Sequence, residues 1–303
     1  MKIEEIFKEI LDEEKLSKFK NSYEFKKYKE SILNDAKEFL TPSDRVFLSR
    51  YKNRPKAKDF IENIIDDPIY FKGDRCFKED SSIICGIGKL DDEVVTFIGI
   101  NKGRDFEESI KCNFGMVNPE GYRKAVRIMK QAEKFKRPII CFVDTPGAYP
   151  GVGAEERGQA EAIAKSIYTM AGINTNTVSV ITGEGASGGA IALCVCDHLI
   201  MMENAIYSIL SPEGFASILW RDSGKVDKAI EIMKLTSKDL YKFKICDEVI
   251  EENLAPTQED FFENYSRLKN SIVDALKKLK NIPKDELLKN RREKYRSLEW
   301  GLK

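Results

Sequence analysis

Four glycines fall within seven residues, 183–189, between two apolar runs. The run at 178–181 predicts a buried strand, and the run at 190–193 is compatible with a helix. The predicted order is therefore a strand, a glycine turn and the start of a helix. The first N–H groups of a helix have no partners within the helix, and glycine lets a ligand approach the backbone. Such N–H groups are suited to stabilising an oxyanion. The other interpretation is that the glycines only let the helix pack closely on a sheet.

A second loop, residues 144–159, has the same setting. It follows an apolar run at 138–143, contains two prolines and three glycines within eight residues, and precedes a helical pattern that ends near residue 171. Loops at the carboxyl ends of parallel strands meet at one edge of a sheet, where ligands bind. We therefore expect the strands at 139–143 and 178–181 to be neighbours with their loops side by side, although proline and glycine also form ordinary turns.

Strand and helix patterns alternate along the middle of the chain, which predicts an α/β sheet with crossover helices. Apolar runs at 83–90 and 94–100 indicate a hairpin, and a helical pattern at 120–135 follows it. The chain divides into an N-terminal helical extension, the α/β body and a charged helical tail, at residues 1–56, 57–258 and 259–303.

Charge and apolar patterning argue against several classes of protein. The 50 Lys and Arg residues balance 50 Asp and Glu residues, so net charge gives no sign of nucleic-acid binding. No apolar run reaches the ~20 residues that span a bilayer, and the acidic, amphipathic N-terminus does not look like a signal peptide. The seven cysteines have no disulfide spacing, and Cys85, Cys141 and Cys194 lie in apolar runs. This pattern predicts buried free thiols in a reducing cytoplasm.

Three specific motifs, for a serine hydrolase, a dinucleotide site and a zinc site, are incomplete in this sequence. Ser187 stands in a G-x-S-x-G pattern, but the single histidine, His198, follows only eleven residues later, at the expected start of the next strand. Glu156 occupies the position of the third glycine in a dinucleotide fingerprint. Cys194 and Cys196 are too close together for a zinc knuckle and have no second pair, so we predict no metal in this chain.

Five stretches of the sequence carry a family resemblance: residues 113–116 (Asn-Phe-Gly-Met), 119–125 (Pro-Glu-Gly-Tyr-Arg-Lys-Ala), 144–159, 183–190 and 211–220. With these stretches the chain resembles the alpha subunit of the bacterial acetyl-coenzyme A carboxylase carboxyltransferase, in register from about residue 59 to residue 250. The long match at 144–159 is very specific. Ala186 stands where the family usually has glycine, and Phe215 where cysteine is common, but the pair Gly188-Gly189 is intact.

The resemblance implies a crotonase-like (ClpP-like) α/β fold of repeated ββα units with N-terminal and C-terminal helical extensions. It also implies transfer of the carboxyl group of carboxybiotin, which is held by a carrier protein and not attached to this chain, to acetyl-coenzyme A. The product is malonyl-coenzyme A for fatty acid synthesis. Biotin itself then supplies the base, which fits the shortage of histidine. The backbone N–H groups of Gly188 and Gly189 are assigned to the biotin oxyanion. The expected biotin-binding loops comprise Pro146, Gly147, Ala148, Tyr149, Pro150, Gly151, Gly185 and Ala186.

Partners also follow from the resemblance. A beta subunit, which carries the family's zinc ribbon and the thioester site, completes an α2β2 assembly that works with the biotin carboxyl carrier protein and biotin carboxylase in the cytoplasm. Two alternatives stay open. One is another crotonase-like hydratase or decarboxylase acting on an acyl-coenzyme A, with Glu120 and Glu184 as candidate acids. The other is a non-catalytic scaffold subunit whose glycine loops bind a protein.

Two constraints are expected at Gly189. A β-branched side chain would resist a positive φ at this turn and would fill the space that the biotin ring needs. Gly189→Val is therefore expected to abolish transfer and to leave the fold largely intact.

Overall fold

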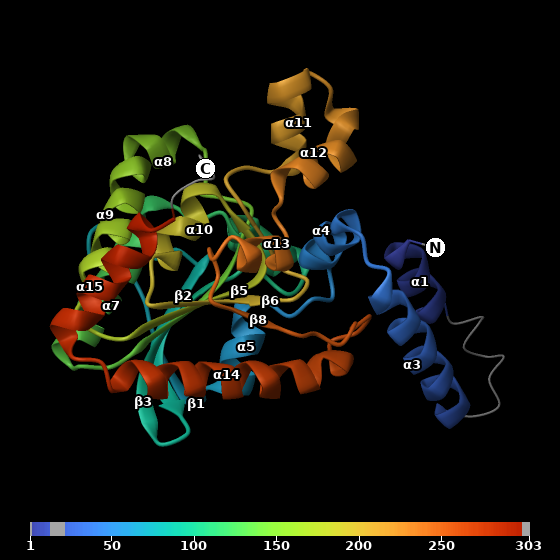
Figure 1. Ribbon diagram of the computed structural model, residues 1–303. Helices are drawn as coiled ribbons and strands as arrows, with labels where there is room; N and C mark the ends of the chain where they lie inside the picture. The colour runs from blue at the N-terminus through green and yellow to red at the C-terminus, as the bar shows by residue number, and fades with distance from the viewer. Residues whose placement is uncertain (1, 13–21, 299–303) are drawn as a thin grey trace.

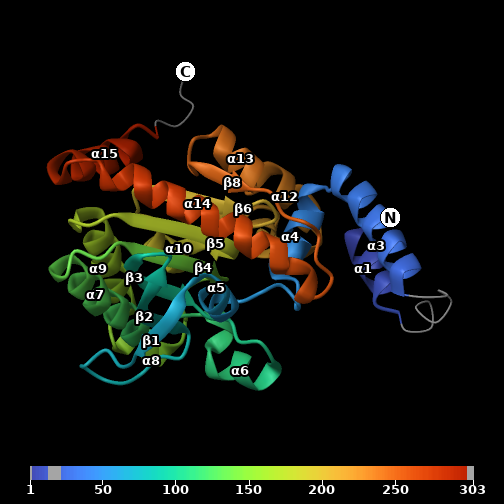
Figure 2. The same ribbon diagram turned by 90° about the horizontal axis from the view of Figure 1, so that it is seen from below.

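The computed structural model describes residues 2–12 and 22–298, and Figures 1 and 2 show it from two sides. Parts of the expected N-terminal extension (residues 1 and 13–21) and of the tail (residues 299–303) lie outside the described residues. No helix of the described part is both long and apolar enough to cross a membrane.

One mixed sheet, of eight strands within the described residues, forms the centre of the molecule (Figure 1). Its order is β1-β2-β3-β4-β5-β6-β8, and β7 pairs with the far end of β5. Pairing is antiparallel from β1 to β3 and parallel from β3 onward. The strands are β1 (Asp66–Phe71), β2 (Ile83–Leu90), β3 (Glu93–Ile100), β4 (Ile139–Thr145), β5 (Thr177–Ala186), β6 (His198–Met202), β7 (Ile206–Ser208) and β8 (Glu248–Ile250).

Helices cover both faces of the sheet. α7, α9 and α10 pack together on one face, whereas α5 and α14 cover the other, where α14 crosses the sheet in Figure 2. α11 and α12 project from the body at the top of Figure 1. The helices are α1 (Ile3–Ile10), α3 (Ser22–Glu38), α4 (Pro42–Arg50), α5 (Ala57–Ile64), α6 (Phe106–Lys111), α7 (Pro119–Lys134), α8 (Val152–Glu156), α9 (Gln159–Gly172), α10 (Ser187–Cys194), α11 (Pro212–Trp220), α12 (Val226–Met233), α13 (Ser237–Lys242), α14 (Phe262–Lys280) and α15 (Lys284–Arg296).

The core lies on both faces of the central strands. Every residue of β4 and β5 is buried, which explains the apolar runs at 139–143 and 178–181 within these strands. Phe60 of α5 stacks on Phe142 of β4, with ring centroids 6.0 Å apart, and meets Tyr265 of α14 edge-on at 5.3 Å. Burial of free thiols is confirmed at Cys85, Cys141 and Cys194.

Two topological predictions are confirmed and one boundary is wrong. β2 and β3 form the expected hairpin, and β4 pairs with β5 in parallel. The glycine turn was placed too early, because β5 does not end near residue 181 but continues to Ala186. Gly183 and Gly185 therefore lie in a strand, where residues 184–186 pair with β7.

The N-terminal helices form a smaller apolar cluster beside the sheet. Ile3, Ile6, Phe7 and Ile10 on one face of α1 are buried in this cluster, which also contains Leu48 of α4. α1 and α3 lie at the right-hand margin of Figure 1, and α4 continues from them onto β5. The N-terminal helices are thus connected to the central strand of the sheet.

Candidate active site

The two glycine-containing loops lie against each other at the carboxyl ends of β4 and β5. Thr145 at the end of β4 is paired with Gly185 of β5. A Cβ atom added at Gly189 would lie 2.8 Å from the N atom of Ala148 and 2.8 Å from the C atom of Gly147. Only a glycine allows the backbones of the two loops to approach so closely. The prediction that the loops lie side by side is confirmed.

Gly188 and Gly189 stand in the first turn of α10, whose N-cap is Ala186. No side chain caps this helix, and N–H groups in a first helical turn have no partner within the helix. Gly188 is half-buried, and a Cβ there would meet only Ile163, at 3.6 Å. The arrangement offers backbone donors beside a surface without side-chain bulk, as an oxyanion site requires.

The expected reason for glycine at position 189 was partly wrong. The residue with positive φ at this junction is Ser187, at 58°, and neither Gly188 nor Gly189 has a positive φ. Close approach of Gly147 and Ala148 is what excludes a side chain at Gly189.

Hydrogen bonds from and to the backbone of the loop after β4 hold this loop in place. Gly147, with φ 141°, donates its N–H to Thr145 Oγ1 at 3.0 Å. Tyr149 N donates to Val117 O at 3.0 Å, and Gln159 Nε2 donates to Tyr149 O at 2.9 Å. These bonds fix the loop without using a side chain that could carry out chemistry.

The other residues predicted to bind biotin lie either in the loop after β4 or within β5. Pro146 and Pro150 are exposed, and Tyr149 is half-buried with its ring over Gly151, where an added Cβ would lie 2.3 Å from Tyr149 Cε1. Gly185 and Ala186 are buried within β5 and do not belong to the exposed loop surface.

A buried ion cluster, Arg50–Lys102–Asp144–Glu184, lies directly behind the loops and was not predicted. Lys102 Nζ lies 2.7 Å from Asp144 Oδ1 and 3.2 Å from Glu184 Oε2. Arg50 Nη2 lies 2.7 Å from Glu184 Oε1, and its Nη1 lies 2.7 Å from Glu213 of α11. Burial opposes the charge on Lys102, but the carboxylates of Asp144 and Glu184 raise the pKa of its ammonium group above the usual value. The ammonium group of Lys102 is therefore favoured in its charged form by its two carboxylate partners.

This cluster should limit stability at both extremes of pH. Burial opposes ionisation of Asp144, but Lys102 and Lys56 hold the pKa of its carboxyl below the usual value. Its stabilisation is therefore complete above about pH 4 and is lost as pH falls through the lower folded-state pKa. Lys102, with its raised pKa, stabilises fully below about pH 10 and less as pH rises further. Melting temperatures from pH 2 to pH 11 should show both declines. Asp144→Asn should weaken the acid decline, and an unchanged acid decline in that variant would contradict this assignment.

The two candidate acids of a hydratase are both held by cations. Glu120 is fully buried, and Arg157 lies 3.2 Å from each of its carboxylate oxygens, with Lys78 at 3.5 Å. Glu184 belongs to the buried ion cluster. Both carboxylates are therefore buried and occupied by cations of this chain, which leaves neither open to a substrate.

A serine–histidine triad is excluded by the register of the sheet. His198 pairs with Val178 at the start of β5, whereas Ser187 follows the end of β5. At ~3.3 Å per residue, the nine residues between them along β5 place these two ends roughly 30 Å apart. The imidazole of His198 instead lies 3.1 Å from Glu248.

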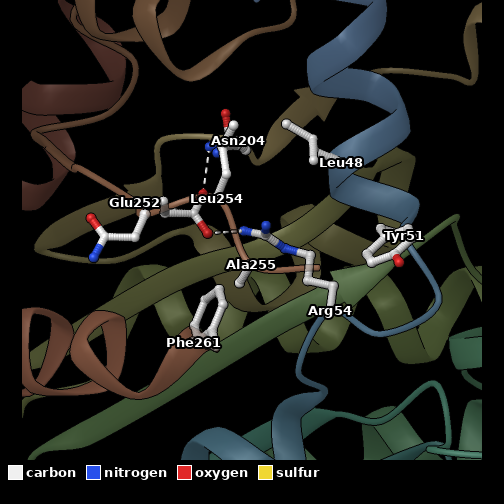
Figure 3. A pocket seen from close by; sticks show the side chains of 9 residues that line it. Leu48, Tyr51, Arg54, Asn204, Glu252, Leu254, Ala255 and Phe261 are labelled. Carbon is white, nitrogen blue, oxygen red and sulfur yellow. Dashed lines mark hydrogen bonds and ion pairs between the residues drawn. The ribbon is translucent and has the colours of Figure 1, made fainter. Parts of the chain in front are cut away.

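A small cavity lies away from the loops, beneath α4 (Figure 3). Its volume is about 10 Å³, and its lining includes Arg54 and Glu252, whose side chains form an ion pair with 2.8 Å between Nη2 and Oε1. Arg54 also donates to Thr182 O of β5 at 2.6 Å. A space of this size holds at most one water molecule, so it is too small for a substrate. The surrounding contacts connect the N-terminal segment to the body. Among the described residues, no group of three or more His, Cys, Asp or Glu residues could hold a metal ion.

Comparison with known proteins identifies one family. A family model described as "Acetyl co-enzyme A carboxylase carboxyltransferase-like" matches residues 1–299. The chain is 49% identical over 268 residues to an acetyl-coenzyme A carboxylase carboxyl transferase subunit alpha of Clostridium botulinum, covering 86% of this chain and 98% of the relative. It is 51% identical over 259 residues to that of Clostridium beijerinckii, covering 86% and 95%. A Clostridium tetani relative named as subunits beta/alpha is 48% identical over 276 residues, covering 90% of this chain and 48% of the relative.

Solved structures share the fold at low sequence identity. The beta subunit of geranyl-CoA carboxylase from P. aeruginosa has a TM-score of 0.59 at 14% identity, covering 81% of this chain and 46% of that chain. Transcarboxylase 12S has a TM-score of 0.57 at 17% identity, covering 75% and 44%. A Pseudomonas malonate decarboxylase MdcD-MdcE hetero-dimer also has a TM-score of 0.57 at 17% identity, covering 80% and 92%. These structures establish a crotonase-like carboxyltransferase fold.

Proposed function

The chain belongs to the acetyl-coenzyme A carboxylase carboxyltransferase family as an alpha subunit, and from this premise we propose that its two glycine loops form the biotin half of the carboxyl-transfer site. The protein is a carboxyltransferase subunit of fatty acid synthesis, and neither a hydratase nor a scaffold role is favoured. The observation that carries the proposal is the direct packing of Gly189 on Gly147 and Ala148, which places uncapped helix N–H groups beside a loop whose prolines, Pro146 and Pro150, are exposed.

The residues of this chain have a limited role in the proposed reaction. Gly188 and Gly189 donate their backbone N–H groups to an oxyanion, and removal of one such donor costs about 3–4 kcal/mol of barrier. The loop of residues 146–151 lies beside them, and its lack of bulk at Gly147, where an added Cβ would meet only Ser187 at 4.0 Å, suits a flat ring. Carboxybiotin, when bound, supplies the carboxyl group and the base. This fits the surroundings of the glycine pair, where Glu184 is paired with Arg50 and Lys102 and His198 is remote.

We also propose the partners and the cellular setting. A beta subunit supplies the acetyl-coenzyme A half of the site in an α2β2 assembly, which is supported by the subunit names of the relatives and by the fused beta/alpha relative. The biotin carboxyl carrier protein and biotin carboxylase deliver the carboxyl group. The described free cysteines suit a reducing cytoplasm.

We propose a division into a carboxyltransferase domain at 57–258 and extensions at 1–56 and 259–303. This division describes the sequence, and the extensions do not pack independently of the domain. Arg50 and Arg54 of the N-terminal extension bind Glu184 and Thr182 of β5. We propose that this extension supports the site from behind.

Reconstitution tests the proposed function. The purified chain alone should form no malonyl-coenzyme A from acetyl-coenzyme A and carboxylated biotin carrier protein, and addition of a beta subunit should restore formation. The reason is that two oxyanions need stabilising and the two glycine loops together form a site for one of them. The isolated chain should also be inactive on an enoyl thioester. Full carboxyl transfer without a beta subunit would overturn the division of labour, and enoyl hydration would revive the hydratase alternative.

A further inference from the structure

We infer that Lys102 is a positioning residue of the carboxyl-transfer site: its ammonium group joins the ends of β4 and β5 and thereby sets the separation of the two glycine loops. This inference rests on the proposed function and concerns a residue that lies behind the loops and does not touch the substrate.

The contacts of Lys102 bridge the last residues before each loop. Its Nζ lies 2.7 Å from Asp144, two residues before Pro146, and 3.2 Å from Glu184, three residues before Ser187. Glu184 N also donates to Asp144 Oδ1, at 2.9 Å. A shift of either strand end would lengthen at least one of these three contacts.

Exclusion of water makes this bridge strong. The side chain of Lys102 is 15% exposed, that of Asp144 is 2% exposed and that of Glu184 is 7% exposed. Charges are weakly screened in such surroundings, so the ammonium group attracts both carboxylates strongly. Without it, Asp144 and Glu184 would be two neighbouring buried carboxylates that repel each other, and their strands would separate. Glu184 would still have Arg50 at 2.7 Å, whereas Asp144 would keep only the weaker attraction of Lys56, so Asp144 would lose more.

Two glycines make room for this bridge. A Cβ at Gly115, which has φ 79°, would lie 2.7 Å from Lys102 Cγ. A Cβ at Gly183 would lie 2.7 Å from Asp144 Oδ1. A side chain at either position would therefore displace one partner of the ion cluster. The bridge also accounts for the glycine in the stretch 113–116, which no part of the proposed reaction uses.

Two substitutions of equal size separate positioning from general stability. Lys102→Met removes the ammonium group and keeps a long side chain. Lys29→Met is the matched control, because Lys29 Nζ lies 2.5 Å from Asp260, its side chain is 17% exposed and it lies on α3 in the N-terminal helical cluster. Both variants would be assayed with the beta subunit, beside the unmodified chain. If the unmodified chain is inactive, the proposed function fails before this inference is reached.

Lys102→Met is expected to lower kcat by about 100-fold with little change in KM, as for a misplacement of about 1 Å in an active site. Lys102→Arg keeps the cation and should recover most of the loss. Amide hydrogen exchange of the isolated chain should accelerate at residues 146–151 and 185–190 in Lys102→Met, whereas in Lys29→Met these two segments should exchange at the unmodified rate. If Lys102→Met does not fold, Lys102→Met/Asp144→Asn replaces it, because this double variant removes the unpaired charge. The same changes in kcat and in hydrogen exchange are then expected. Unchanged kcat and unchanged exchange at both loops would overturn the inference, as would equal effects of the Lys102 and Lys29 variants.

Discussion

Gly189→Val is expected to lower the kcat of the complex with the beta subunit by about 100-fold or more. A Cβ at this position would lie 2.8 Å from backbone atoms of Gly147 and Ala148, so the two loops must move apart to admit it. Valine adds two methyl groups beyond that Cβ and has little rotamer freedom to avoid the contact. Because the displaced backbone carries donors that act in the transition state, the loss should appear in kcat more than in KM.

Two other glycines provide controls for this prediction. A Cβ at Gly188 would make an ordinary contact with Ile163 at 3.6 Å, and one at Gly172 would meet nothing within 4 Å. Gly188→Ala should therefore melt at the unmodified temperature, and Gly172→Ala should also keep the unmodified kcat. Gly189→Ala, with one added carbon, distinguishes a local shift from unfolding. A Gly189→Val variant with normal melting and normal turnover would show that this glycine is not part of the site.

The central part of the fold could be predicted because its signals are local. β4 and β5 are buried on both faces, so each contains an apolar run, at 139–143 and 178–181, and a glycine-rich segment follows each run. Parallel strands joined by a short helical crossover, here α8 and α9, are usually neighbours, which brings their loops together. The reaction and the role of the glycine pair came from the family resemblance. Neither can be inferred from the periodicity of apolar residues.

The buried ion cluster could not be predicted in this way. Arg50, Lys102, Asp144 and Glu184 are separated by about 40 residues or more along the chain, and each is one of the many charged residues of the sequence. The only local signal was glycine at positions 115 and 183, and glycine reports a lack of space without identifying the neighbour. The extension of β5 was missed for a related reason, because glycines weaken a strand pattern and the pairing with β7 is a tertiary contact.

The tail was expected to be a charged helix, and the sequence alone gives no sign that one of its cations is buried. Arg291 of α15 is 2% exposed, and its guanidinium meets Asp197 with two contacts of 2.7 Å. The same guanidinium donates to the backbone carbonyls of Met170, Ile173 and Thr175 at 2.7, 2.9 and 3.0 Å. These five contacts connect the tail to the end of α9, to the segment between α9 and β5, and to Asp197 just before β6.

Arg291→Met should therefore destabilise the protein by about 3–5 kcal/mol, because it leaves the carboxylate of Asp197 buried without its cation. The expected fall in melting temperature is about 10 °C. Lys289→Met on the same helix is the control, because Lys289 is 72% exposed and its ion pair with Glu293 is 3.8 Å long; we expect a change within about 0.5 kcal/mol. Addition of Asp197→Asn to Arg291→Met should recover part of the loss, since the remaining cost is then one of unpaired hydrogen bonds and not of an unpaired charge. Equal melting of the Arg291 and Lys289 variants would mean that α15 packs on the body without this ion pair. A double variant less stable than Arg291→Met would mean that Asp197 stabilises the start of β5 mainly through its bonds to Thr177, at 2.8 Å.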